Sequence, residues 1–166
     1  MKSSFEDYVT QLAPTVAAAE KPTVFLLSCM DYRYAHRITD VMDHQGLRRK
    51  YDIFALAGAA AGANEVEEWG DVLVEHIKVA RSIGHPIDHL MILEHRDCGA
   101  YKKFFGLDWA EVTPPVEAAK HLEQVKILSA HLHQVFDEEI HNLQIDSFLL
   151  ARDEDDPLQI EGKDHS

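Results

Sequence analysis

Apolar residues in this chain gather in short continuous runs that alternate with longer amphipathic segments. Runs of strand length lie at Thr23–Cys29, Tyr51–Ala55, Ile87–Glu94 and Ile145–Leu150. Continuous apolar runs of this length, bounded by turn residues, are typical of strands that are buried on both faces of a parallel sheet. The pattern therefore predicts about four parallel strands.

The segments between these runs have helical periodicity. Apolar residues three and four positions apart predict helices at about residues 34–45, from Asn64 to the stop at Gly84, at 100–105 and at 114–139. Asn64, with Glu67 three residues later, resembles a capping box that would begin the second of these helices. The alternation of strand and helix predicts an α/β fold, a mostly parallel sheet flanked by helices on both faces.

Residues 1–20 carry a helical pattern of their own. Phe5, Tyr8, Val9 and Leu12 are spaced three and four apart, and Pro14 follows them. Because proline lacks the backbone N–H that continues a helix, the pattern predicts an amphipathic helix followed by a second short one. Such an arm needs a surface on which its apolar face can pack.

In residues 56–63, Leu56 is followed only by alanines and by the glycines Gly58 and Gly62. Alanine favours helix, but two glycines directly after a predicted strand favour a tight loop that lines a site. Gly58 and Ala59 are therefore candidate substrate-binding residues.

The C-terminal part of the chain predicts one further strand. Asp153–Asp156 form an acidic turn, after which residues Pro157–Ile160 return as a short antiparallel edge strand. Proline is tolerated at the edge of a sheet, so Pro157 is compatible with this prediction.

Length and charge narrow the function classes. The 166 residues suit a single domain, and 16 basic against 29 acidic residues give a net charge of −13. This sign disfavours nucleic acid and anionic membranes as partners, because phosphate binding requires positive charge. No apolar run approaches the roughly 20 residues that span a bilayer, and the N-terminus lacks a secretion pattern, so we expect a cytoplasmic protein.

The two cysteines of the chain stand at the ends of predicted strands. Cys29 closes the first strand within Cys29-Met-Asp31-Tyr-Arg33, and the third strand leads into His95-Arg-Asp-Cys98-Gly99. In open α/β sheets, ligands bind beyond the carboxyl ends of the strands where the strand order reverses, and the first and third strands are the usual neighbours there. We therefore expect Cys29, His95 and Cys98 to converge.

Two thiolates and an imidazole are ligands that suit Zn²⁺, and three protein ligands leave the fourth tetrahedral position open for water, as in catalytic sites. An open zinc ion lowers the pKa of its water and supplies hydroxide. Asp31 can occupy the fourth position or swing away to a bidentate bond with Arg33, so this pair is the predicted gate and catalytic pair. Gly99 would let the backbone approach the metal through a strained turn, and it is the third candidate substrate-binding residue.

Simpler interpretations exist for each of these residues. Either cysteine alone suits core packing, Asp31 can cap the following helix, and Arg33 can be a solvated residue of its first turn. The conjunction of the motifs favours the metal site. Other chemistry is excluded by counting, because a Cys-x₅-Arg phosphatase loop would need arginine where Ala35 stands, and the chain has no Cys-x-x-Cys pair and no glycine-rich phosphate loop.

Cys-x-Asp-x-Arg followed by His-x-x-Cys-Gly resembles the signature of the β-class carbonic anhydrases, and Cys29, Asp31, Arg33, His95, Cys98 and Gly99 match it position by position. The resemblance extends over most of the chain. It implies an α/β fold, zinc held by Cys29, His95 and Cys98, and reversible hydration of CO₂ to bicarbonate. It also implies a homodimer or higher even oligomer, with the arm of residues 1–20 packing on a partner subunit.

Two features depart from that family. The chain has Ala55-Leu-Ala-Gly58 where the family usually carries Arg-Asn-Ala-Gly, and the stretch between the two motifs is longer. The loss of polar groups beside the expected pocket leaves two alternatives open. One is hydrolysis of a sulfur analogue such as COS or CS₂, and the other is a non-catalytic dimer in which zinc only clamps two strands.

Overall fold

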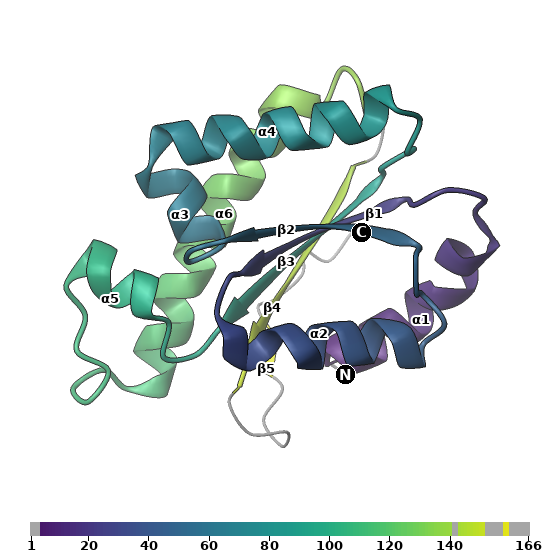
Figure 1. Ribbon diagram of the computed structural model, residues 1–166. Coiled ribbons are helices and arrows are strands. Elements are labelled where there is room, and N and C mark those ends of the chain that lie inside the picture. The colour runs from purple at the N-terminus through teal and green to yellow at the C-terminus, as the bar shows by residue number, and fades with distance from the viewer. Residues whose placement is uncertain (1–3, 141–142, 152–157, 160–166) are drawn as a thin grey trace, which may run out of the picture.

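The computed structural model describes residues 4–140, 143–151 and 158–159. Its centre is a five-stranded sheet in the order β2-β1-β3-β4-β5 (Figure 1). The strands are β1 (Val24–Cys29), β2 (Tyr51–Leu56), β3 (His89–His95), β4 (Gln144–Leu150) and β5 (Leu158–Gln159). β1 to β4 pair in parallel, and β5 pairs antiparallel to β4. The predicted mostly parallel sheet with an antiparallel edge strand is confirmed.

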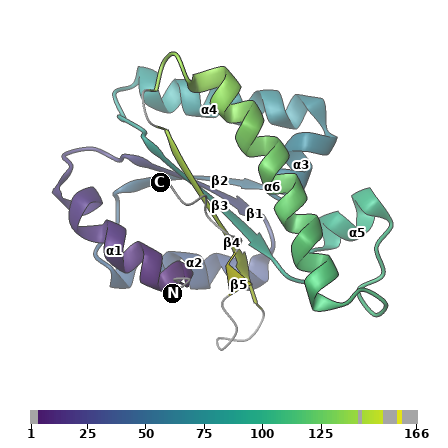
Figure 2. The same cartoon turned by 180° about the vertical axis from the view of Figure 1, so that it is seen from behind.

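Helices cover both faces of the sheet, as predicted (Figures 1 and 2). One face carries α1 (Phe5–Ala18) and α2 (Tyr32–His44). The other carries α3 (Ala60–Glu65), α4 (Glu67–Ser82) and α6 (Pro114–Phe136), and α5 (Gly99–Phe105) stands beyond the carboxyl end of β3. α6 ends at Phe136, three residues before the predicted end at Glu139.

Side-chain alternation along β3 divides the core into two layers. Leu90 and Ile92 are buried against α4 and α6, whereas Met91 and Leu93 are buried against α1 and α2. A strand that is buried on both faces needs apolar residues at every position, which is why these residues form a continuous run. At the end of β3 the same alternation directs consecutive polar side chains to opposite faces.

The N-terminal prediction of two helices is wrong, because α1 continues through Pro14 as one helix. Its apolar face packs on the chain's own sheet through Phe5, Val9, Ala13 and Val16, and the Tyr8 hydroxyl donates a hydrogen bond to Asp146 of β4. Packing of this face outweighs the local cost of the proline, since tertiary contacts supply most of a helix's stability. Contact of the arm with a partner subunit stays a prediction and would involve its other side.

The small-residue segment is mostly helix, which corrects the predicted loop over residues 56–63. Only residues 57–59 form the turn, and α3 begins at Ala60. The N-terminal N–H of α3 is satisfied from outside the segment, because the Glu94 carboxylate of β3 accepts from Ala60 N at 2.9 Å. Asn64 is not a helix cap either: it lies within α3, and Val66 precedes α4. These contacts are long-range and leave no local pattern.

The C-terminal edge strand is confirmed at Leu158–Gln159. The predicted acidic turn at Asp153–Asp156, together with Pro157 and Ile160, lies outside the described residues. Among the helices in the described part of the chain, none combines the length and apolar character needed to cross a membrane.

Gly62 should be required for the packing of α3. A Cβ atom at this position would lie 2.2 Å from the Ala57 carbonyl oxygen, whereas one at Gly99 meets no atom within 4 Å. We expect Gly62→Ala to lower the free energy of unfolding by about 3 kcal/mol or more, the upper range for overpacking. Gly99→Ala, the matched control, should change it by less than about 1 kcal/mol. Urea denaturation of both variants measures the difference, and equal effects would contradict the packing argument.

Candidate metal centre

The three predicted metal ligands meet at the carboxyl edge of the sheet. Cys29 ends β1, His95 ends β3, and Cys98 follows at the turn into α5. Because β1 and β3 are parallel neighbours, their carboxyl ends lie at the same edge. One ligand atom from each residue lies within 4.8 Å of the other two, and the two Sγ atoms are 3.9 Å apart.

The imidazole of His95 is oriented for ligation. Its Nδ1 lies 2.8 Å from the Arg96 carbonyl oxygen, so Nδ1–H donates there and the Nε2 lone pair faces the two sulfurs. Nε2 is buried and makes no hydrogen bond within the described residues. The Tyr34 ring of α2 stacks on the imidazole with a centroid separation of 4.5 Å. A buried nitrogen without a hydrogen bond, fixed in this way, is a feature that a metal ion would explain.

The charges of the three groups depend on one another. The hydrogen bond from Cys98 lowers the pKa of the Cys29 thiol to about 4, against the effect of burial, and His95 adds to this lowering. The same bond and burial raise the pKa of Cys98. Burial lowers the pKa of His95, but the neighbouring Cys29 thiolate outweighs it and the net shift is upward. The shared hydrogen bond thus favours ionisation of Cys29 over ionisation of Cys98.

This donor set fits zinc. Zn–S distances of about 2.3 Å at a tetrahedral angle place two sulfurs about 3.8 Å apart, close to the 3.9 Å found here. Soft thiolates with one imidazole are typical of tetrahedral zinc, and three ligands leave one position for another group.

Asp31 and Arg33 form the predicted pair beside the ligands. Arg33 donates from Nε to Oδ1 at 2.9 Å and from Nη2 to Oδ2 at 2.6 Å, and its backbone N–H also donates to Oδ1. Asp31 therefore caps α2 and binds Arg33 at once, and its role as a gate and catalytic residue stays a prediction. Oδ2 lies 3.7 Å from His95 Nε2 and faces the ligand cluster. The Arg33 bonds lower the pKa of Asp31 to about 2.

The three predicted substrate-binding residues differ in their positions. Gly58 N–H donates to Cys29 Sγ at 3.3 Å, so this residue contacts the site. Ala59 is fully buried in the core beneath α3. Gly99 begins α5 without a positive φ, and the strained turn expected there lies instead at Asp97, whose φ is 55°. Asp97 occupies the sharp turn that carries the chain from His95 to Cys98. Substrate binding by these residues stays a prediction.

Sequence reasoning missed a row of buried polar side chains behind the site. Glu94 of β3 and three residues of α6, namely Glu117, His121 and Gln124, are all buried. Glu117 accepts from Arg96 Nη1 and from Asp97 N, both at 2.7 Å, and Gln124 accepts from Asn64 of α3 at 2.9 Å. The signal was present in the sequence, because polar residues at positions 117, 121 and 124 share one side of a helix.

Apolar side chains surround the sulfur ligands. Cys98 is buried with Ala61 and Tyr101, and Phe104, Phe105, Leu107 and Trp109 pack against this cluster. Trp109 donates its ring N–H to the Cys98 carbonyl oxygen at 3.2 Å, which ties the segment after α5 to the ligand turn. The metal centre therefore borders hydrocarbon surface on the α5 side.

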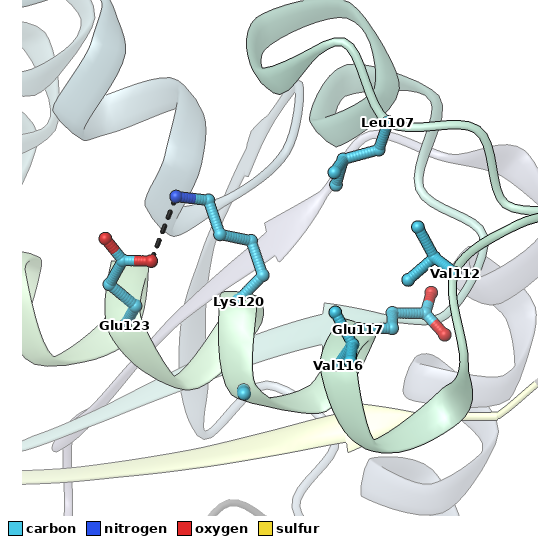
Figure 3. A pocket seen from close by; sticks show the side chains of 7 residues that line it. Leu107, Val112, Val116, Glu117, Lys120 and Glu123 are labelled. Atoms are coloured by element: carbon cyan, nitrogen blue, oxygen red, sulfur yellow. Dashed lines mark hydrogen bonds and ion pairs between the residues drawn. The ribbon is translucent and has the colours of Figure 1, made fainter.

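A separate open cavity of about 250 Å³ lies between residues 107–112 and the first turns of α6 (Figure 3). Val116 and Lys120 line it together with Leu107 and Val112, and Lys120 pairs with Glu123 at its rim. None of its seven lining residues is one of the three candidate ligands, so this cavity is distinct from the metal centre.

Solved structures with the same architecture are carbonic anhydrases. The carbonic anhydrase of Streptococcus mutans matches with a TM-score of 0.54 and 18% identity, covering 97% of this chain and 99% of that one. A tetrameric β-carbonic anhydrase of Sordaria macrospora matches with a TM-score of 0.55 and 11% identity, covering 89% and 84%. At these identities the similarity establishes a β-carbonic anhydrase-like fold.

Relatives by sequence come from Rickettsia, and no model of a known protein family matches the chain. An uncharacterized protein of Rickettsia bellii is 30% identical over 133 residues, which cover 79% of this chain and 77% of that protein. One of Rickettsia conorii is 28% identical over 133 residues, covering 79% and 68%. The chain belongs to the same family as the Rickettsia bellii protein.

The Asp31–Arg33 pair should make stability depend on pH in the metal-free protein. The pKa of Asp31 is lowered from 3.8 to about 2 on folding, so the pair stabilises the fold above about pH 4, and this contribution is lost as the pH falls toward about 2. Asp31→Asn keeps a capping oxygen but removes the charge. We expect the difference in unfolding free energy between wild type and Asp31→Asn to shrink as the pH falls from about 6 to 2. Urea denaturation at each pH measures it, and a pH-independent difference would refute the charge argument.

Proposed function

We propose that this protein is a zinc-dependent carbonic anhydrase that hydrates CO₂ reversibly to bicarbonate. The observation that carries the proposal is the convergence of Cys29, His95 and Cys98 at one edge of the sheet, next to an ionised Asp31 held by Arg33. The β-carbonic anhydrase-like fold supports it. Both cysteines are free, which suits a reducing compartment such as the cytoplasm.

Cys29, His95 and Cys98 would hold the zinc ion, which supplies a Lewis acid and a water of lowered pKa. Asp31 is ionised at neutral pH, and the Arg33 bonds lower its pKa further, to about 2. Its Oδ2 faces the ligand cluster, so it accepts a hydrogen bond from the attacking water and directs a lone pair of that water at the substrate. Arg33 keeps the carboxylate in this orientation through two side-chain bonds.

The surroundings of the site suit a small apolar substrate. CO₂ has no net charge or dipole, and the cluster around Cys98 offers aromatic and aliphatic surface beside the ligands. Ala55 and Leu56 stand where the β-class carbonic anhydrases usually carry arginine and asparagine. Leu56 packs against the core under α3, so this part of the chain supplies no polar side chain to a product.

Zinc content and stopped-flow CO₂ hydration test the proposal together. Wild type should bind a single zinc ion per chain and hydrate CO₂ well above the uncatalysed rate. Cys98→Ala should lose zinc and reduce the rate to background, because two ligands hold the ion far less tightly than three. Asp31→Asn should keep its zinc and lose about 10²-fold in kcat/KM, the cost of a misdirected nucleophile.

The outcomes separate the candidate functions. Equal hydration rates for wild type and Cys98→Ala would overturn the proposal. Sulfide release from COS or CS₂ without CO₂ hydration would identify a hydrolase of sulfur analogues. A full complement of zinc with neither activity would identify a zinc ion that only clamps β1 to β3. Gln124→Met, which alters a buried residue away from the ligands, is the control for general damage to the fold.

We infer further that the chain forms a homodimer through β2 and α4. β2 is an edge strand of the sheet, and its Ile53 is 53% exposed. Val72 and Val79 of α4 are exposed and lie four and three positions from His76, whose ring contacts Phe54 of β2, and Ile83, directly after α4, is exposed as well. An edge strand beside an exposed apolar stripe is a self-complementary surface for a two-fold interface. The tetrameric Sordaria macrospora enzyme is consistent with an even oligomer.

A charge placed within this surface should separate the subunits. We expect wild type to sediment as a dimer or larger even oligomer and Val79→Glu to sediment as a monomer, since burying an unpaired carboxylate at an interface is costly. Val116→Glu is the matched control, because Val116 is 57% exposed, similar to the 55% of Val79, but lies on α6. A monomeric wild type, or equal behaviour of the two variants, would contradict this interface.

A further inference from the structure

A fully buried glutamate lies next to the candidate ligand His95 and points away from it. Glu94 is the penultimate residue of β3, and its side chain lies on the α3 and α6 face, whereas His95 stacks on Tyr34 of α2. Its exposed fraction is zero, as is that of His121. A buried carboxylate is costly unless both oxygens find partners, so its contacts identify what it holds in place.

Both carboxylate oxygens of Glu94 have partners. Oε1 accepts from Ala60 N at 2.9 Å, and Oε2 lies 3.0 Å from Nδ1 of His121. The Tyr101 ring packs against the His121 imidazole at a centroid separation of 3.8 Å, with the two planes tilted by 37°, and restricts its movement. His121 thus positions the carboxylate, and the carboxylate positions the first N–H of α3.

The segment that Glu94 holds is the one that contacts Cys29. Ala59 has a φ of 42°, a conformation that costs a residue with a side chain about 1–3 kcal/mol and persists only when its surroundings impose it. Gly58 directly precedes it, and a Cβ atom at this position would lie only 2.8 Å from Ala100 Cβ. The Gly58 N–H donates to Cys29 Sγ at 3.3 Å. Release of Ala60 N would let the turn relax and withdraw this donor from the sulfur.

We propose that Glu94 and His121 are positioning residues for the metal centre, which hold the Gly58 N–H on Cys29 Sγ and thereby slow the release of zinc. This role rests on the proposed zinc function. Hydrogen bonds to a ligating sulfur stabilise the metal-bound form, and loss of such outer contacts typically costs about 10- to 100-fold in metal affinity. Neither residue touches the metal itself.

His121→Phe tests the proposal, because phenylalanine keeps the ring against Tyr101 but removes the donor to Glu94. We expect zinc release to a chelator to become about 10- to 100-fold faster. His121→Asn restores a donor near the position of Nδ1 and should return the rate to within about threefold of wild type. In the cobalt-substituted protein, His121→Phe should also shift the thiolate-to-metal charge-transfer band, which reports the donor to Cys29 Sγ.

Gln124→Met is the matched control. Gln124 is also a buried polar residue of α6, but its partner is Asn64 at the far end of α3, so its loss should leave zinc release unchanged. Equal acceleration in Gln124→Met and His121→Phe, no acceleration in His121→Phe, or failure of His121→Asn to rescue would each overturn the proposal. If His121→Phe does not fold, Glu94→Gln takes its place, because one amide oxygen can serve only one of the two donors.

Hydrogen exchange of the metal-free protein separates this proposal from the proposed function. The amides of Gly58 and Ala60 should exchange about tenfold faster in His121→Phe, while those of β1 and β3 stay protected. Uniformly faster exchange across the sheet would show that the pair only stabilises the fold. If wild type binds no zinc, the zinc function fails, and the local exchange result still decides whether Glu94 and His121 hold the turn.

Discussion

The parallel pairing of β1 with β3 is the constraint on which the candidate site depends. Two strands distant in the sequence lie side by side with their carboxyl ends at one edge, because the sheet order places β1 between β2 and β3. The side chains that follow each strand then meet without any local sequence relation between them. Burial of the strands on both faces stabilises this pairing, so the same apolar runs that form the core also determine where the sulfur and nitrogen ligands converge.

Polar groups are also buried behind the candidate metal centre, and α6 carries most of them. Glu117, His121 and Gln124 lie in one row and contact the ligand turn, Glu94 and α3, respectively. Each of these side chains makes a hydrogen bond that offsets part of its desolvation. A wholly apolar α6 would pack well but would leave the backbone N–H of Asp97 without its acceptor and the buried Glu94 carboxylate without its His121 partner. The row of polar residues therefore supplies buried hydrogen bonds to the segments beside the candidate ligands.

The sequence predicted those parts of the molecule that depend on local patterns. The four parallel strands lie within two residues of the predicted bounds because continuous apolar runs mark them, and the Cys29 and His95 motifs led to the right edge of the sheet. Long-range effects were not predictable in this way. α3 begins at Ala60, whose N–H is accepted by a glutamate 34 residues away, and α1 continues through Pro14 with its neighbours Ala13 and Val16 packed in the core. Neither contact can be predicted from the distribution of apolar residues along the chain.

Two strained turns beside the candidate cysteine ligands are held by buried glutamates. Ala59 and Asp97 are two of the three described non-glycine residues with positive φ, and each lies in a turn beside a candidate cysteine ligand. Each turn is held by its own buried glutamate, because Glu94 accepts from the N–H after Ala59 and Glu117 accepts from the N–H of Asp97 itself. Strained turns of this kind persist only when the surrounding structure imposes them. The two glutamates thus connect the rigid elements β3 and α6 to the turns beside Cys29 and Cys98, which gives a structural reason for burying two carboxylates behind the candidate ligands.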